Sequence, residues 1–176
     1  MPDREPPISP TISPQELFVR YQELQSYVGW SEDDARCLRR IRGAAERLLP
    51  ELVDDFYREI ERHPEALRVM TGGHEQLARL KRMLRLWLRE LFGGPYDADY
   101  VVRRWRAGIR HFEIGLPSIF IHAALARLRQ GLLIGLHEVW PGEASDLPES
   151  LVALNRLLDL DLAIIHWAYQ TAALAR

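Results

Sequence analysis

Residues 105–117, Trp-Arg-Ala-Gly-Ile-Arg-His-Phe-Glu-Ile-Gly-Leu-Pro, are the most informative stretch of this chain. In a helix, Gly108 lies three residues before His111 and Gly115 four residues after it, so both neighbours of the imidazole on that face lack a side chain. Each glycine costs a helix about 1 kcal/mol relative to alanine, which suggests that something approaches the backbone closely there. The local pattern leaves two interpretations open: a histidine that binds a flat cofactor, or a core histidine bonded to a carbonyl group.

The composition is that of one folded domain without disulfides. The chain has 176 residues, of which 47% are hydrophobic and 27% are charged. A formal net charge of -2 argues against a nucleic-acid partner, because phosphate binding needs a clustered basic excess. The single cysteine, Cys37, excludes an internal disulfide and a multi-thiolate zinc site, so we expect a cytoplasmic protein. Residues 1–13 lack the apolar core of a signal peptide and are expected to be a flexible leader before a domain over 14–176.

Helical spacing of apolar residues recurs along the whole domain, and no run alternates with the period of a strand. We expect an all-α fold of seven or eight helices. Pro50 is expected to end one helix and open the next, because proline suits a first helical turn. The most apolar stretch, 132–136, is far shorter than the roughly 20 residues that cross a bilayer, so no membrane contact is expected. The helices over 118–138 and 149–173 are apolar on more than one face, which implies more than one burial surface.

Other candidate sites are weaker than His111. The remaining histidines lack the spacing of a helical zinc motif, so we expect surface or hydrogen-bonded structural roles for His63, His74, His122, His137 and His166. Carboxylate pairs such as Asp54-Asp55 have no partnered nucleophile or phosphate-binding loop beside them, so no enzyme is predicted. Asp161, which lies among leucines, is expected to be a buried cap or a contact between subunits. Tyr57, taken alone, is expected to be an ordinary core aromatic.

Several motifs taken together resemble the globin domain of the globin-coupled sensors, which are haem-based gas sensors related to protoglobins. The resemblance covers about 15–173 and depends above all on His111-Phe112-Glu113-Ile114-Gly115-Leu116-Pro117. The other matching elements are Asp55-Phe56-Tyr57 followed by His63-Pro64-Glu65, Leu80-Lys81 leading to Trp87, Leu91-Phe92-Gly93-Gly94, Leu157-Leu158-Asp159-Leu160-Asp161, and Tyr169. The resemblance implies a globin fold with an extra N-terminal helix and no D helix.

The resemblance also implies a site for haem b. His111 would be the proximal ligand of the iron through one neutral imidazole nitrogen, while the other nitrogen would donate to a backbone carbonyl. Tyr57 matches the distal tyrosine of the family, whose hydroxyl can donate to bound dioxygen and would favour it over the less polar carbon monoxide. Gly108 and Gly115 would clear space for the porphyrin, and Arg104 is expected to contact a propionate. The other expected haem contacts are Phe56, Leu80, Met83 and Trp87 on the distal side and Ile114 on the proximal side.

The chain departs from the family pattern at two places. Many relatives carry a Trp-Tyr pair after the Gly-Leu-Pro element, whereas this chain has Phe120-Ile121, so a tyrosine that changes its bonding on ligand exchange is unavailable there. Some relatives carry a threonine where this chain has Met83, which leaves Tyr57 as the expected polar distal group. The sequence ends soon after the last predicted helix, which is typical of either a single-domain sensor globin or a piece of a longer signalling protein.

The expected function is therefore a gas-sensor domain, with dioxygen as the first candidate and carbon monoxide or nitric oxide as the others. Ligand binding would shift His111 and repack the last two helices, and two chains would form a homodimer through 118–138 and 149–173, as in the family. Two alternatives remain open. One is a globin-like interaction module without haem, and the less favoured one is a haem enzyme such as a peroxidase or a nitric oxide dioxygenase.

Overall fold

The structure is a computed structural model that describes residues 12–175. Within this part the chain forms seven α-helices and one short 3-10 helix, with no strand, which confirms the predicted all-α fold. Of the leader expected over 1–13, only residues 12 and 13 lie in the described part. The elements in chain order are α1 (Pro14–Val28), α2 (Glu32–Ile60), α3 (Pro64–Leu67), α4 (Gly73–Gly93), α5 (Ala98–Glu113), α6 (Ser118–Val139), η1 (Ala144–Asp146) and α7 (Leu147–Leu174).

The helix boundaries follow from local capping groups. Ser13 and Glu16 form a reciprocal capping box at the start of α1, and Gly29 ends that helix in the left-handed conformation with φ 71°. The carboxylate of Asp97 accepts a hydrogen bond from the Tyr100 backbone N–H at 2.9 Å and so begins α5. These short-range signals are the reason that the start of α5 and the interruption after α1 were predictable.

The prediction that Pro50 separates two helices is wrong, because α2 continues through it from Glu32 to Ile60. Proline has no N–H, so the carbonyl of Glu46 receives no helical hydrogen bond from position 50. Pro50 lies on the exposed side of α2, where water can reach that carbonyl. Leu49 and Val53, on the adjacent face of the helix, are both buried in the core, and this packing keeps the two halves of α2 in line.

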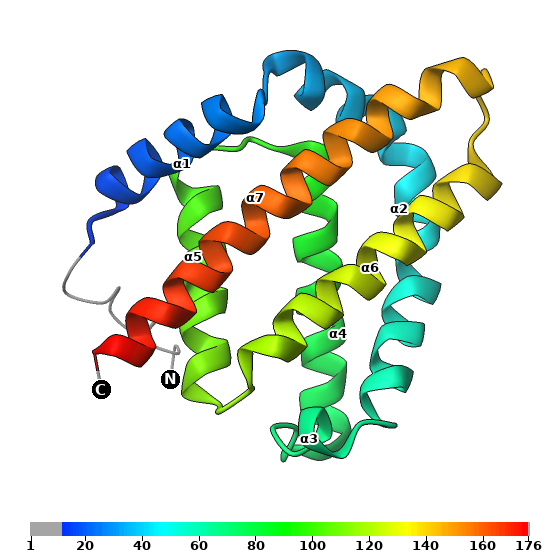
Figure 1. The fold of residues 1–176 in the computed structure, drawn as a ribbon. Coiled ribbons are helices and arrows are strands. Elements are labelled where there is room, and N and C mark those ends of the chain that lie inside the picture. Colours follow the sequence, from blue (N-terminus) through cyan, green and yellow to red (C-terminus); the bar gives the residue numbers. More distant parts are fainter. Residues whose placement is uncertain (1–11, 176) are drawn as a thin grey trace.

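The helices form two crossing layers. Figure 1 shows α6 and α7 running diagonally in front of α5, α4 and α2, while α1 crosses near one end of α5. The closest helix pairs are α5 with α7 and α2 with α4, whereas the backbones of α4 and α5 barely approach each other. The core lies between the layers and includes Trp105, Leu132 and Leu157, which are fully buried.

The two apolar stripes of α7 are used largely within the chain. One stripe is entirely buried against neighbouring helices, and it consists of Leu154, Leu157, Ile164 and Ala168. The other stripe is buried at Leu158 and Ile165 and partly exposed elsewhere. Much of the apolar surplus that motivated a dimer is therefore accounted for by α7 lying between α5 on one side and α2 and α6 on the other.

Helix α6 is more apolar than the 132–136 stretch alone suggested. By length and composition it is sufficient to cross a membrane, a property that core helices share. It also carries Arg127, which pairs with Asp55 of α2 at 2.8 Å, and Arg129, which pairs with Asp159 of α7. These ion pairs and the buried residues of α6 identify it as a packed member of the bundle.

Candidate functional site

Ion pairs between helices show which residues of α2, α4 and α5 lie at the same level of the molecule. In the antiparallel pair α2 and α4, Lys81 bonds to Asp54 at 2.9 Å, so Tyr57 comes within a turn of Leu80. In the antiparallel pair α4 and α5, Arg104 bonds to Glu90. Seven residues further along each helix, in opposite directions, Met83 comes to the level of His111. Three helices therefore bring Tyr57, Leu80, Met83 and His111 within about one and a half helical turns of one another along the helix axes.

The imidazole of His111 lies in the last turn of α5, and it has an unusual environment. Its Nδ1 atom is buried, and no hydrogen-bond partner for that atom exists in the described part of the chain. Burial lowers the pKa of His111, because removal from water disfavours the charged imidazolium. The backbone carbonyl that we expected as an acceptor for this ring is not found. The site therefore presents a neutral imidazole, which is the form that binds metals, with an unpaired polar atom.

Tyr57 is buried, with 8% of its surface exposed, on the face of α2 that packs against α4. Burial raises the pKa of Tyr57 to about 12, because the phenolate would be poorly solvated there. The hydroxyl is therefore protonated at neutral pH and can act as a hydrogen-bond donor. Phe56 packs edge-on against its ring, with centroids 5.2 Å apart, and so restricts its orientation.

The predicted distal residues of α4 do not all occupy equivalent places. Leu80 and Trp87 are partly buried against the core. Met83 is 55% exposed, and its angular position on α4 lies close to that of Glu90, the residue that reaches α5. Trp87 lies about one helical turn from the level of His111, beside the guanidinium of Arg104. Leu80 and Met83 are thus the α4 residues placed opposite His111.

Gly108 was predicted to make room for a porphyrin, and the structure corrects this prediction. A Cβ atom at this position would lie 2.1 Å from the carbonyl oxygen of Ile165 and 2.7 Å from the Cβ of Ala168. The missing side chain therefore allows the backbone of α7 to approach α5. Gly115, with φ 73° and no atom within 4 Å of an added Cβ, serves as the left-handed end of α5.

Arg104 was expected to contact a haem propionate, and the structure gives it a different role. Its side chain is 1% exposed, and its Nε donates to Asp161 of α7 at 2.9 Å. Its other two nitrogens bond to the carboxylate of Glu90 and the carbonyl of Trp87. All three guanidinium nitrogens are engaged and the side chain is buried, so Arg104 joins α4, α5 and α7 within the protein.

The sequence interpretation did not connect Arg104 with its buried partners. Asp161 is fully buried, as one of its two expectations required, and it also accepts a hydrogen bond from the Tyr100 hydroxyl at 2.8 Å. The ring of Tyr100 lies 3.6 Å from the Arg104 guanidinium. A single acid in an otherwise apolar helix was the available signal, but its cation lies 57 residues away in the sequence.

Two of the motifs that carry the family resemblance are in contact between α5 and α7. Phe112, the neighbour of His111, packs edge-on against Tyr169 with ring centroids 5.4 Å apart. Ile114, expected on the proximal side, is half-buried and is the C-cap residue that follows α5. Two surface hollows are present elsewhere, one between α6 and α7 and one beside Cys37, and neither includes His111 or Tyr57.

The residues present fit a flat, metal-containing cofactor such as haem. A neutral imidazole with a buried, unpaired nitrogen suits a metal ligand, and a protonated tyrosine lies on another helix within about one and a half turns of its level. Met83 and Leu80 supply apolar surface between the two. Gly108 and Arg104, by contrast, are withdrawn from the set of cofactor contacts.

Comparison with known proteins identifies the fold and the family of the chain. The chain is similar to the globin domain of a Geobacter sulfurreducens globin-coupled sensor, with 25% identity and a TM-score of 0.75. The match covers 85% of this chain and 97% of that domain, so the predicted globin fold, with an extra first helix and no D helix, is confirmed. A sequence model named Protoglobin matches residues 19–174. Together these matches support a haem-binding sensor globin, and the chain belongs to the protoglobin family.

Proposed function

We propose that the chain is a dioxygen-sensing domain that holds haem b through the imidazole of His111. The observation that carries the proposal is the buried Nδ1 of His111, which has no partner among the described residues although burial keeps the ring neutral. A buried polar atom without a hydrogen-bond partner lowers the stability of the fold, and such an imidazole is expected where the ring has another role, such as binding a metal. The haem iron, when bound, supplies the position to which a diatomic gas attaches.

Tyr57 is proposed to select among gases. Its hydroxyl stays protonated because burial disfavours the phenolate, so it can donate a hydrogen bond to a bound gas. A bound dioxygen carries partial negative charge and gains more from such a donor than carbon monoxide does. Leu80 and Met83 offer no further donor at this level, so the discrimination depends on Tyr57.

The test of the haem proposal is the absorption spectrum of the purified chain, ferric and then reduced, with and without carbon monoxide. We expect a Soret band in the chain and in His74→Ala, which removes an exposed histidine far from the site. In His111→Ala we expect the band to be lost or to shift unless imidazole is added. A colourless chain that does not take up haem would contradict the proposal and favour an interaction module without cofactor.

We propose that ligand state reaches the last helix through the contact of Phe112 with Tyr169. Phe112 follows His111 in the chain, so displacement of the imidazole would move the Phe112 ring against Tyr169 of α7. Helix α5 is packed against α7 more tightly than against any other helix. A change in Tyr169 fluorescence or chemical shift on carbon monoxide binding, absent in Phe112→Leu, would support this path. An unchanged environment of Tyr169 would contradict it.

We expect that movement to alter a homodimer interface formed by α6 and α7. A hollow of about 430 Å³ lies between these helices, and Leu133, Leu162 and the 51% exposed Ile134 contribute to its lining. Burying this apolar surface against a second copy would use the part of the stripes that the chain leaves open. Sedimentation should show a dimer that Ile134→Glu disrupts, and a stable monomer at micromolar concentration would refute it.

A further inference from the structure

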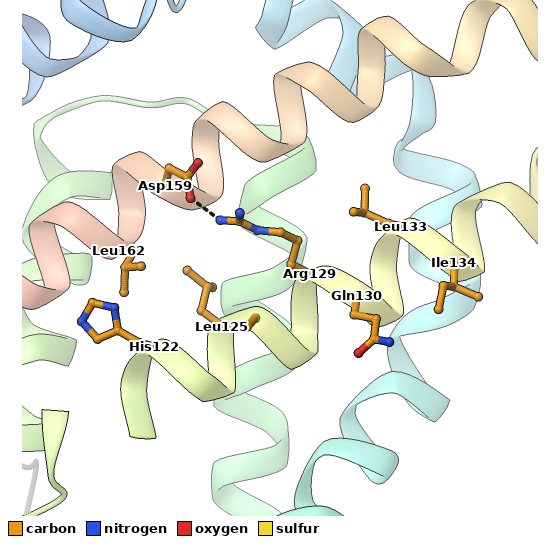
Figure 2. Close-up of a pocket in the computed structure, with 9 residues that line it drawn as sticks. His122, Leu125, Arg129, Gln130, Leu133, Ile134, Asp159 and Leu162 are labelled. Carbon is orange, nitrogen blue, oxygen red and sulfur yellow. Dashed lines mark hydrogen bonds and ion pairs between the residues drawn. The ribbon is translucent and has the colours of Figure 1, made fainter. Parts of the chain in front are cut away.

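His122 on α6 and His166 on α7 form a second histidine pair, which includes none of the residues proposed to hold haem. The Nε2 atom of His122 on α6 lies 3.2 Å from the Nδ1 atom of His166 on α7. The rings are steeply inclined, with centroids 4.9 Å apart and an interplanar angle of 74°. Figure 2 shows His122 at one end of the hollow between the two helices, beside Leu125 and Leu162.

The two nitrogens are spaced as two ligands of one metal ion would be. Tetrahedral Zn²⁺ binds imidazole nitrogens at about 2.0–2.1 Å, which places two of them about 3.3 Å apart. The two nitrogens are hydrogen-bonded to each other, and no carboxylate bonds to either ring in the described part of the chain, so a metal ion would replace this one hydrogen bond. His122 is exposed and His166 is half-buried, which leaves one side of the pair open to water.

The helix scaffold holds this pair in place. Helices α6 and α7 are antiparallel neighbours, and Arg129 bonds to Asp159 across them. Arg129 lies seven residues after His122, and Asp159 lies seven residues before His166, so the two contacts are successive rungs of one helix pair. Figure 2 shows the Arg129–Asp159 rung beside the hollow. A site on two packed helices is better preorganised than one on loops.

We propose that His122 and His166 form a binding site for a divalent transition metal ion, with Zn²⁺ as the probe. His122 binds through Nε2 and His166 through Nδ1, and water completes the coordination. Both imidazoles bind in their neutral forms with the proton on the other nitrogen, so no oxidant or further reactant is required. Cross-linking α6 to α7 would restrain the helices through which we propose that ligand state is read, a consequence that depends on the proposed function.

The experiment is a calorimetric titration of Zn²⁺ into the full chain and into three single variants. We expect saturable binding that is weakened at least about tenfold in both His122→Ala and His166→Ala, because each removes one of two ligands. His137→Ala removes an exposed histidine from the other end of α6 and should bind like the unaltered chain. Zn²⁺ should also raise the midpoint of thermal unfolding only where both histidines are present.

Two results would overturn the metal site. Equal Zn²⁺ affinity in the unaltered chain and in the His122 and His166 variants would place the metal elsewhere. No saturable binding in any of them would show that the pair is only a hydrogen bond between two side chains. Neither histidine belongs to the site around His111, so the Soret band should be the same in all three variants. Failure of the metal site is thereby distinguishable from failure of the haem proposal.

Discussion

Helix α5 meets α7 and α4 in opposite ways. Against α7 the contact is so close that Gly108 leaves no room for a methyl group in front of the Ile165 carbonyl. Against α4 the backbones barely approach, and the Arg104–Glu90 ion pair joins the helices at one end. His111 lies at the other end of that side, with an unpaired nitrogen. Helix α5 is thus packed tightly on its α7 side and loosely on its α4 side, where the proposed haem ligand lies.

Removal of the Arg104 guanidinium should have the largest effect, because it leaves the fully buried Asp161 without its cation. We expect Arg104→Met to lower the free energy of unfolding by about 3–5 kcal/mol in a denaturant titration. Arg103→Met is the matched control, because Arg103 pairs with Glu90 at 2.9 Å on the surface and should cost less than about 1 kcal/mol. The double variant Arg104→Met with Asp161→Leu should recover most of the loss. Equal effects of the two arginine variants would show that the buried pair contributes little.

A methyl group at Gly108 should have the next largest effect, because it tests the close side of α5. Gly108→Ala must displace the backbone of α7 or α5, since the added Cβ would lie 2.1 Å from the Ile165 oxygen. We expect a loss of about 2–3 kcal/mol in the free energy of unfolding. Gly43→Ala is the control, because nothing lies within 4 Å of that Cβ in α2, and it should stabilise by up to about 1 kcal/mol. If Gly108→Ala is as stable as the unaltered chain, the close contact is not what holds α5.

Replacing Tyr57 by phenylalanine tests the loosely packed side of α5 near the level of His111. Loss of one hydroxyl donor, worth about 1 kcal/mol, should speed dioxygen release by up to about tenfold. Carbon monoxide release should change much less, because that ligand gains little from the donor. Stopped-flow displacement of each gas from the haem-loaded protein measures both rates. Equal acceleration of both gases would indicate a change of packing and exclude the hydrogen bond as the cause.

The smallest effect on stability is expected at Met83, where a substitution should affect haem binding and leave the fold almost unchanged. Met83 of α4 and Val19 of α1 are exposed apolar residues, each at 55%, but only Met83 lies on the helix whose Glu90 reaches α5. Glutamate at either position should change the free energy of unfolding of the haem-free chain by no more than about 0.5 kcal/mol. Met83→Glu alone should speed haem loss, measured by transfer of the Soret band to a haem-free acceptor globin. Equal haem loss in both variants would place the cofactor away from this face.

The interruption before α2 and the start of α5 were predictable because their signals are local. Ser31 with Asp34, and Asp97 with Tyr100, are contacts three residues apart, and apolar spacing along one helix indicates its buried face. The interpretation failed at Pro50 because packing of Leu49 and Val53 outweighs a local signal to stop. Local signals therefore predict helices well wherever tertiary packing does not oppose them.

The sequence by itself determined the fold class, and the family motifs within it identified His111 and Tyr57 as the candidate site residues. Only the tertiary structure decided that Gly108 faces α7, that Arg104 is buried with Asp161, and that His122 meets His166. The physical reason is that each of these depends on which turn of one helix lies opposite which turn of another. Periodicity within a helix gives its buried face, but the register between helices is set by packing and by ion pairs that join residues far apart in the chain.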